Sequence, residues 1–181
     1  GAQAVVTLIE GIDNLDSLST LLDPPAQAAM VGAPSFAPAA DSTWEWTESG
    51  VTYTLAYTET ATEYQWELVA DGSDGVVSYN NFVVAELTEA KDGSSGSFAV
   101  HVRSIAGFAF SYDWTVSGGT LTMTLTMGTA AYYIQVVATV ESDGSGEIMV
   151  YDGAELKAKV IWDGNGHGQW WNYSDTGEGT F

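Results

Sequence analysis

The feature that most constrains the fold is an alternation of bulky and hydroxyl-bearing side chains that begins near Ser42 and continues to Tyr173. Between residues 120 and 126, threonine occupies every even position, while Leu121, Met123 and Leu125 occupy the odd ones. Successive side chains of a β-strand point to opposite faces, so this rhythm indicates half-buried strands. Glycine- and aspartate-rich turns interrupt it at short intervals. We predict a mainly β protein, an antiparallel up-and-down meander of about 10–11 strands.

Placing two-residue turns at four dipeptides tests whether the apolar residues share a face. The opposed pairs would be Trp46–Tyr53 and Trp44–Leu55 about Ser49-Gly50; Tyr57–Tyr64, Leu55–Trp66 and Tyr53–Leu68 about Thr60-Ala61; Trp114–Met123, Tyr112–Leu125 and Phe110–Met127 about Gly118-Gly119; and Leu125–Tyr132, Met123–Ile134 and Leu121–Val136 about Gly128-Thr129. Every pair is aromatic or aliphatic, which predicts one apolar face. A turn at Asp152-Gly153 fits only if the hairpin contains a bulge.

The N-terminal part of the chain follows a different period. Apolar residues recur there at the three- and four-residue spacing of an amphipathic helix. They are Val5, Leu8, Ile9, Ile12, Leu15, Leu18, Leu21 and Leu22. Asp23-Pro24-Pro25 ends the pattern, because the residue before a proline avoids the helical region. We therefore expect a helical segment over residues 1–25, an Ala/Pro linker over 26–41 and an antiparallel β domain over 42–181 that folds as one unit with the helix.

An apolar sheet face must be covered, and the N-terminal helix is a candidate cover. We therefore predict a barrel or half-barrel with the helix packed on it. A partly open barrel leaves an apolar cavity between helix and sheet. Side chains predicted to line this ligand-binding cavity are Trp44, Trp46, Leu55, Trp66, Phe110, Trp114 and Met123.

The charge balance excludes several classes of function. A formal charge of -20, from 24 acidic and 4 basic residues, excludes nucleic-acid binding, which needs a lysine and arginine footprint. It also argues against anionic membrane surfaces. The acids are spread along the whole chain, which suits either a salt-adapted source or an ordinary acidic secreted protein. No apolar run reaches the length of a membrane-spanning helix, so no membrane span is expected.

The residues give no support to catalysis, a metal or a cofactor. The chain has no cysteine and two histidines, so thiol chemistry and cysteine-type zinc sites are excluded. The Gly-rich acidic segments at 71–75, 143–147 and 163–167 are interpreted as hairpin turns, because Asp-Gly is a common turn dipeptide. His101 is interpreted as an exposed sheet residue, and His167 lies in one of these turns. We predict a non-catalytic protein.

The first residues of the chain are compatible with two cellular locations. It begins Gly1-Ala2-Gln3-Ala4 without a basic leader region, which fits either a cytosolic protein or a mature chain whose leader has been removed. The threonine-, serine- and glycine-rich composition favours export to the periplasm or cell surface, with a lipid anchor as one form.

The predicted elements are a helix over residues 5–22, a proline-containing connection and an aromatic meander over residues 42–173. This order of elements resembles that of the bacterial periplasmic lipoprotein carriers, which have an unclosed barrel and a helical plug. The resemblance implies binding of an acyl chain or another apolar molecule between helix and sheet. Two alternatives stay open. One is an accessory interaction subunit of a cell-surface or membrane complex, with a protein partner. The other is a carbohydrate-binding module that uses Trp171 and Tyr173, or Trp170, as a platform.

Overall fold

A computed structural model describes residues 29–31, 41–173 and 177–180. They form thirteen strands in a single sheet. The strands are β1 (Ala29–Val31), β2 (Asp41–Glu48), β3 (Val51–Glu59), β4 (Glu63–Ser73), β5 (Ser78–Ala90), β6 (Ser95–His101), β7 (Ala109–Ser117), β8 (Thr120–Thr129), β9 (Tyr132–Val140), β10 (Gly146–Asp152), β11 (Glu155–Trp162), β12 (Gly168–Asn172) and β13 (Gly177–Thr180).

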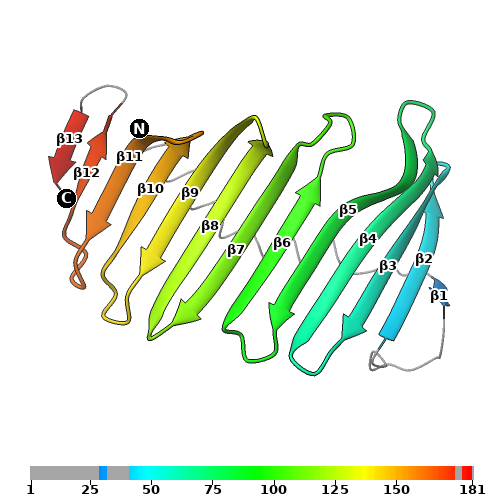
Figure 1. The fold of residues 1–181 in the computed structure, drawn as a ribbon, viewed down its shortest axis with the longest axis horizontal. Helices are drawn as coiled ribbons and strands as arrows, with labels where there is room; N and C mark the ends of the chain where they lie inside the picture. The colour runs from blue at the N-terminus through cyan, green and yellow to red at the C-terminus, as the bar shows by residue number, and fades with distance from the viewer. Residues whose placement is uncertain (1–28, 32–40, 174–176, 181) are drawn as a thin grey trace.

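The strands lie side by side in chain order, each antiparallel to the next (Figure 1). This confirms the antiparallel meander. The sheet is open, because β1 and β13 form its two edges and do not pair with each other. Of the two expected forms, a barrel or a half-barrel, the closed barrel is therefore excluded. A one-layer ribbon results because each strand pairs only with its neighbours in sequence, and nothing in the described pairings brings the first and last strands together.

The predicted N-terminal helix lies outside the described residues. Within the described ranges the model contains strands and turns and no helix. Among these residues, accordingly, no helix is long and apolar enough to cross a membrane. In the stretch expected to be a linker, Ala29–Val31 forms β1 and pairs with Thr43–Glu45 of β2.

Two of the four predicted turns have the register expected from the sequence. About Ser49-Gly50, Trp46 lies opposite Tyr53, and about Gly118-Gly119, Trp114 lies opposite Met123. Both glycines of the second turn have positive φ angles, which side chains disfavour.

The other two registers were wrong by an even number of residues. Between β3 and β4, Tyr57 lies opposite Trp66 rather than Tyr64. The loop is longer than two residues because the Thr60 hydroxyl accepts hydrogen bonds from the amides of Thr62 (3.3 Å) and Glu63 (2.9 Å). Such side-chain capping stabilises a wider turn.

Between β8 and β9, Leu125 lies opposite Val136 rather than Tyr132. The turn falls at residues 130–131, after Gly128 and not on it. Gly128 is a strand residue whose Cβ, if it had one, would lie 2.3 Å from the Tyr132 carbonyl oxygen. The glycine is therefore required by a close approach of backbone and not by the turn.

Bulges adjust the sheet in two places. The expected irregularity in the β10–β11 hairpin is present, between Val150 and Tyr151. The β4–β5 pair shifts register between Leu68 and Val69 and again between Ala70 and Gly72. A bulge adds a residue to one strand and lets the remaining side chains keep their faces.

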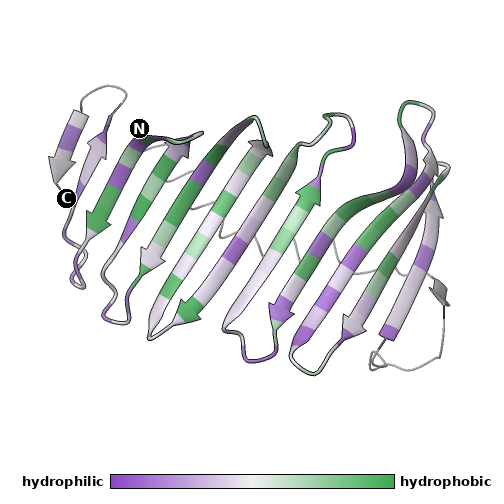
Figure 2. Ribbon diagram, viewed as in Figure 1, coloured by the Kyte–Doolittle hydropathy of each residue, from purple (hydrophilic) through white to green (hydrophobic). Residues whose placement is uncertain are grey.

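The register divides the sheet into an apolar face and a polar face. Hydrophobic and hydrophilic bands alternate along most strands (Figure 2). A hydrophobic core on the apolar face is formed by Leu55, Leu68, Ala85 and Phe98 of β3 to β6. The polar face carries threonines of β2, β3 and β8 together with the acidic residues Glu45, Glu67 and Glu86.

Candidate ligand-binding face

The apolar face is continuous from β2 to β12 because residues opposite each other in the register share a face. Its two longest rows are Trp44–Leu55–Leu68–Ala85–Val100–Phe110–Met127–Ile134 and Trp66–Leu87–Phe98–Tyr112–Leu125–Val136–Val150–Ala158. A third row continues through Trp114, Met123, Ala138, Ile148, Val160 and Trp170. Side chains from eleven strands thus form one floor.

All seven residues predicted to bind a ligand lie on this face, in two groups. Trp44, Trp46, Leu55 and Trp66 lie on β2 to β4. Phe110, Trp114 and Met123 lie on β7 and β8. Strands β5 and β6 separate the groups, with Leu87 and Phe98 on the face between them.

Aromatic contacts hold the first group together. The Trp44 and Trp66 rings stack with centroids 6.0 Å apart, and Trp46 stacks on Tyr53 at 5.5 Å. Leu55 beneath them is 1% exposed. Offset stacks of this kind add to the stabilisation from burial. The side chains of this group pack against one another and belong to the hydrophobic core.

Three tryptophans of the apolar face lie over glycines of the neighbouring strand. A Cβ at Gly96 would lie 2.0 Å from the Trp114 ring, one at Gly146 2.5 Å from the Trp162 ring, and one at Gly179 2.6 Å from the Trp170 ring. Glycine lets each indole lie close against the backbone. The alternation of side chains does not by itself indicate these pairs. Their signal is a glycine that falls opposite a tryptophan on the apolar face.

Charged groups occur only at the ends of the apolar face among the described residues. Glu59 and Glu89 lie at one end, and Glu48 and Asp152 lie at the other. Glu59 forms an ion pair with Lys91 and accepts a hydrogen bond from the Tyr57 hydroxyl at 3.3 Å. The hydrogen bond from Lys91 holds the pKa of Glu59 below its ordinary value.

The tyrosines of the face lie in dehydrated surroundings. Burial raises the pKa of Tyr53, Tyr57 and Tyr112 above the ordinary value for a phenol. Removal of water disfavours the charged phenolate, which is the direction found at all three. The apolar face therefore presents apolar side chains and the neutral hydroxyls of these tyrosines.

The polar face offers no comparable site. His101 lies on this face, partly exposed, with its Nε2 atom 3.0 Å from a Glu86 oxygen. No group of three or more potential metal ligands occurs among the residues that the structure describes.

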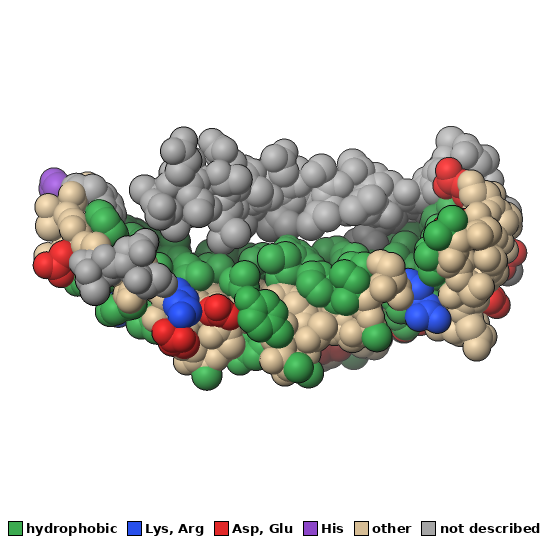
Figure 3. All heavy atoms as spheres, turned by 90° about the horizontal axis from the view of Figure 1, so that it is seen from above, with side chains coloured by type: hydrophobic (Ala, Val, Ile, Leu, Met, Phe, Trp, Pro, Cys, Tyr) green, Lys and Arg blue, Asp and Glu red, His purple; other side chains and the backbone are tan. Residues whose placement is uncertain are grey.

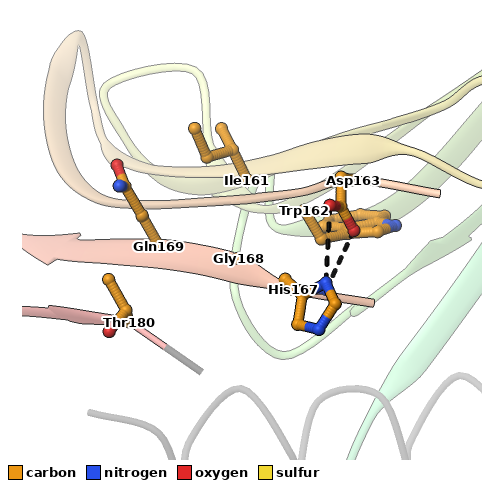
Figure 4. Close-up of a pocket in the computed structure, with 7 residues that line it drawn as sticks. All are labelled: Ile161, Trp162, Asp163, His167, Gly168, Gln169 and Thr180. Carbon is orange, nitrogen blue, oxygen red and sulfur yellow. Dashed lines mark hydrogen bonds and ion pairs between the residues drawn. The ribbon is translucent and has the colours of Figure 1, made fainter. Parts of the chain in front are cut away.

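A shallow depression lies at the C-terminal end of the sheet (Figure 4). Ile161, Gln169 and Thr180 line it beside the turn that carries Asp163 and His167. Those last two side chains approach to 3.5 Å. Trp171 lies on the same face as Gln169, whereas Trp170, 38% exposed, lies on the apolar face. Carbohydrate binding through Trp171 stays a prediction.

Comparison of the chain with protein-family models, curated proteins and solved structures finds no match. The resemblance to the lipoprotein carriers therefore stays an expectation from the order of elements in the sequence.

Proposed function

We propose that this chain is a non-catalytic binding protein whose apolar face holds an acyl chain or a similar apolar molecule. The proposal rests on one observation: charged side chains are absent from the interior of this face across its width. From β2 to β11 its interior rows consist of aromatic, aliphatic and small residues, β12 adds Trp170 and Asn172, and charged groups are confined to the ends of the strands. Apolar surface of this extent favours an apolar occupant.

A helix formed by residues 1–28 would cover only part of this face. Thirteen strands have twelve spacings of ~4.8 Å, which makes the sheet about 58 Å wide. Residues 1–28, even as one continuous helix, would extend ~42 Å and cover a band ~10 Å across. Apolar floor is left over beside such a helix.

We further propose that residues 5–22 form the predicted helix and lie on the apolar face. Their apolar stripe matches the floor in chemistry, and β1 starts the sheet at the edge beside Trp44 and Trp46. A ligand would then lie between helix and sheet. The indoles over Gly96, Gly146 and Gly179 lie close against the backbone, which keeps them low on the apolar face.

Tryptophan fluorescence provides the test, because six of the seven tryptophans lie on the apolar face. A stearic acid with a nitroxide on its chain quenches indoles that it contacts. We expect saturable quenching of wild-type protein, reversed by unlabelled stearate.

A matched pair of variants on β8 locates the binding. Met123→Asp places a charge on the apolar face and should weaken binding about tenfold or more, since a desolvated carboxylate is costly. Thr122→Asp places the same charge on the polar face, one residue away and between Thr115 and Thr139 of the neighbouring strands, and should leave the affinity within about twofold, because a solvated charge is nearly neutral there. Met123→Ser is a milder substitute should the first variant unfold.

Two outcomes would contradict the proposal. One is the absence of saturable quenching in the wild-type protein. The other is equal affinity in the apolar-face and polar-face variants, each shown by a cooperative thermal transition to be folded. Export and a lipid anchor stay predictions from composition.

A further inference from the structure

The exposed hydrophobic side chains gather at one end of the sheet. Among the described residues, eight large hydrophobic side chains are exposed. Six of them lie in or beside the connections that follow β4, β6, β8 and β12, at the upper end of the strands in Figure 1. We name this set the apolar rim: Val76, Ile105, Met127, Tyr132, Ile134 and Tyr173.

Hydrogen-bonded turns present these side chains to solvent. The Asp74 carboxylate accepts hydrogen bonds from the amides of Val76 (2.8 Å) and Val77 (2.7 Å), and Val76 at that turn is 92% exposed. The Ile105 amide donates to the Val102 carbonyl at 3.2 Å. The Tyr132 amide donates to the Thr129 hydroxyl at 3.2 Å. Each tip is thus held outward by its own turn, although exposure of such groups to water is unfavourable.

The opposite end of the sheet is acidic. The connections there and the strand ends beside them carry Asp41, Glu59, Glu63, Glu89, Asp92, Glu141, Asp143 and Asp163, with Lys91 as the basic residue. The lower connections are correspondingly hydrophilic in Figure 2. Acids also occur at the apolar rim, namely Glu48, Asp71, Asp74, Asp152, Glu155 and Glu178. That end, however, also holds two of the four basic residues, Arg103 and Lys157.

The apolar rim is continuous with the apolar face. Met127 and Ile134 lie opposite each other in the row that starts at Trp44, and they are 43% and 38% exposed. Both ends of the face also carry carboxylates: Glu59 and Glu89 at the acidic end, and Glu48 and Asp152 at the rim end, where Asp152 lies opposite Ile134. Viewed along the strands from above, hydrophobic side chains extend along the rim (Figure 3). The apolar face therefore extends to side chains that are exposed to solvent at the apolar rim.

We propose that the apolar rim is the surface by which this protein contacts a lipid bilayer of zwitterionic headgroups. The rim extends from the β4–β5 turn to β12, which is about 38 Å along a row of strand ends at ~4.8 Å spacing. A flat bilayer can receive tips that stand apart in such a row. Aliphatic side chains and tyrosines are suited to its interface.

The distribution of charge sets the orientation. With the acidic end turned away, repulsion from headgroup phosphates is smallest. A protein partner is the less favoured occupant, because glycine, serine and aspartate separate the apolar tips, whereas binding hot spots cluster in packed patches.

Flotation with phosphatidylcholine vesicles tests this inference without any bound ligand. We expect the wild-type protein to float with the vesicles. Ile105→Asp should lower the partition coefficient about tenfold, which is ~1.4 kcal/mol. Val116→Asp is the matched control, because Val116 is 45% exposed against 51% for Ile105 but lies at the acidic end.

Vesicle composition supplies a second arm. Including phosphatidylglycerol should weaken binding at 0.1 M salt and restore it near 1 M, since the Debye length falls from about 10 Å to about 3 Å. Wild-type protein that stays in solution with phosphatidylcholine vesicles would overturn the proposal and leave the rim to a protein partner. Equal losses in Ile105→Asp and Val116→Asp would also overturn it. Stearate quenching is a separate readout, so either proposal can fail alone.

Discussion

At the scale of single residues, the apolar face depends on glycines as much as on aromatics. Gly96, Gly146 and Gly179 lie beneath Trp114, Trp162 and Trp170, where no Cβ fits without displacing the indole. Trp162 is fixed further, since its indole N–H donates to the Gly144 carbonyl at 2.7 Å. These pairs let large rings lie flat, so the floor stays shallow.

Gly96→Ala should destabilise the protein by about 1–3 kcal/mol, because the added methyl overpacks the contact with Trp114. Thermal or urea unfolding measures the loss. Ser97→Ala, on the opposite face of the same strand, is the control and should cost less. In a double-mutant cycle with Trp114→Leu, the cost of Gly96→Ala should shrink. Additive costs would show that the ring does not lie over residue 96.

At the scale of elements, aspartates organise several of the turns. The carboxylates of Asp92, Asp143 and Asp163 each accept a hydrogen bond from the amide two residues later, at 2.9 Å. Hydrogen bonds to the ionised form hold the pKa of each of these aspartates below its ordinary value. At Asp163 the largest contribution comes from the His167 amide.

The sign of the resulting pH dependence follows from this direction. A lowered pKa in the folded state contributes stability above the ordinary value near 3.8 that is lost as pH falls through the folded pKa. Asp163→Asn keeps an acceptor oxygen and removes the titration. The melting-temperature advantage of wild type over Asp163→Asn should therefore be steady above pH 5 and shrink below about pH 4. An advantage that is independent of pH down to pH 2 would contradict it.

Turn chemistry also explains how far the sequence could predict the fold. The registers about Thr60-Ala61 and Gly128-Thr129 were wrong by two and four residues, because amide hydrogen bonds to the Thr60 hydroxyl and the close backbone approach at Gly128 are not visible in the alternation of side chains. Even-numbered errors leave every side chain on its face. The seven predicted site residues therefore still share one face. The apolar rim was missed, since alternation within strands says nothing about loop tips.

At the scale of the whole molecule, the sheet is an open ribbon with two unlike faces and two unlike ends. One face is apolar and the other is rich in threonine and acids. One end carries apolar tips and the other carries most of the acidic turns. The two proposals rest on these two asymmetries. Both are argued for the open ribbon, because closure would enclose the apolar face inside a barrel.

A distance between spin labels tests this openness most directly, and the absence of cysteine makes labelling clean. Thr54→Cys on β3 and Gln169→Cys on β12 both lie on the polar face. In the open sheet they are nine strand spacings apart, about 43 Å at ~4.8 Å each. In a closed thirteen-stranded ring they would be four spacings apart the other way, about 19 Å. We predict a distance near 40 Å by pulsed electron paramagnetic resonance, and a distance near 20 Å would contradict the open apolar face.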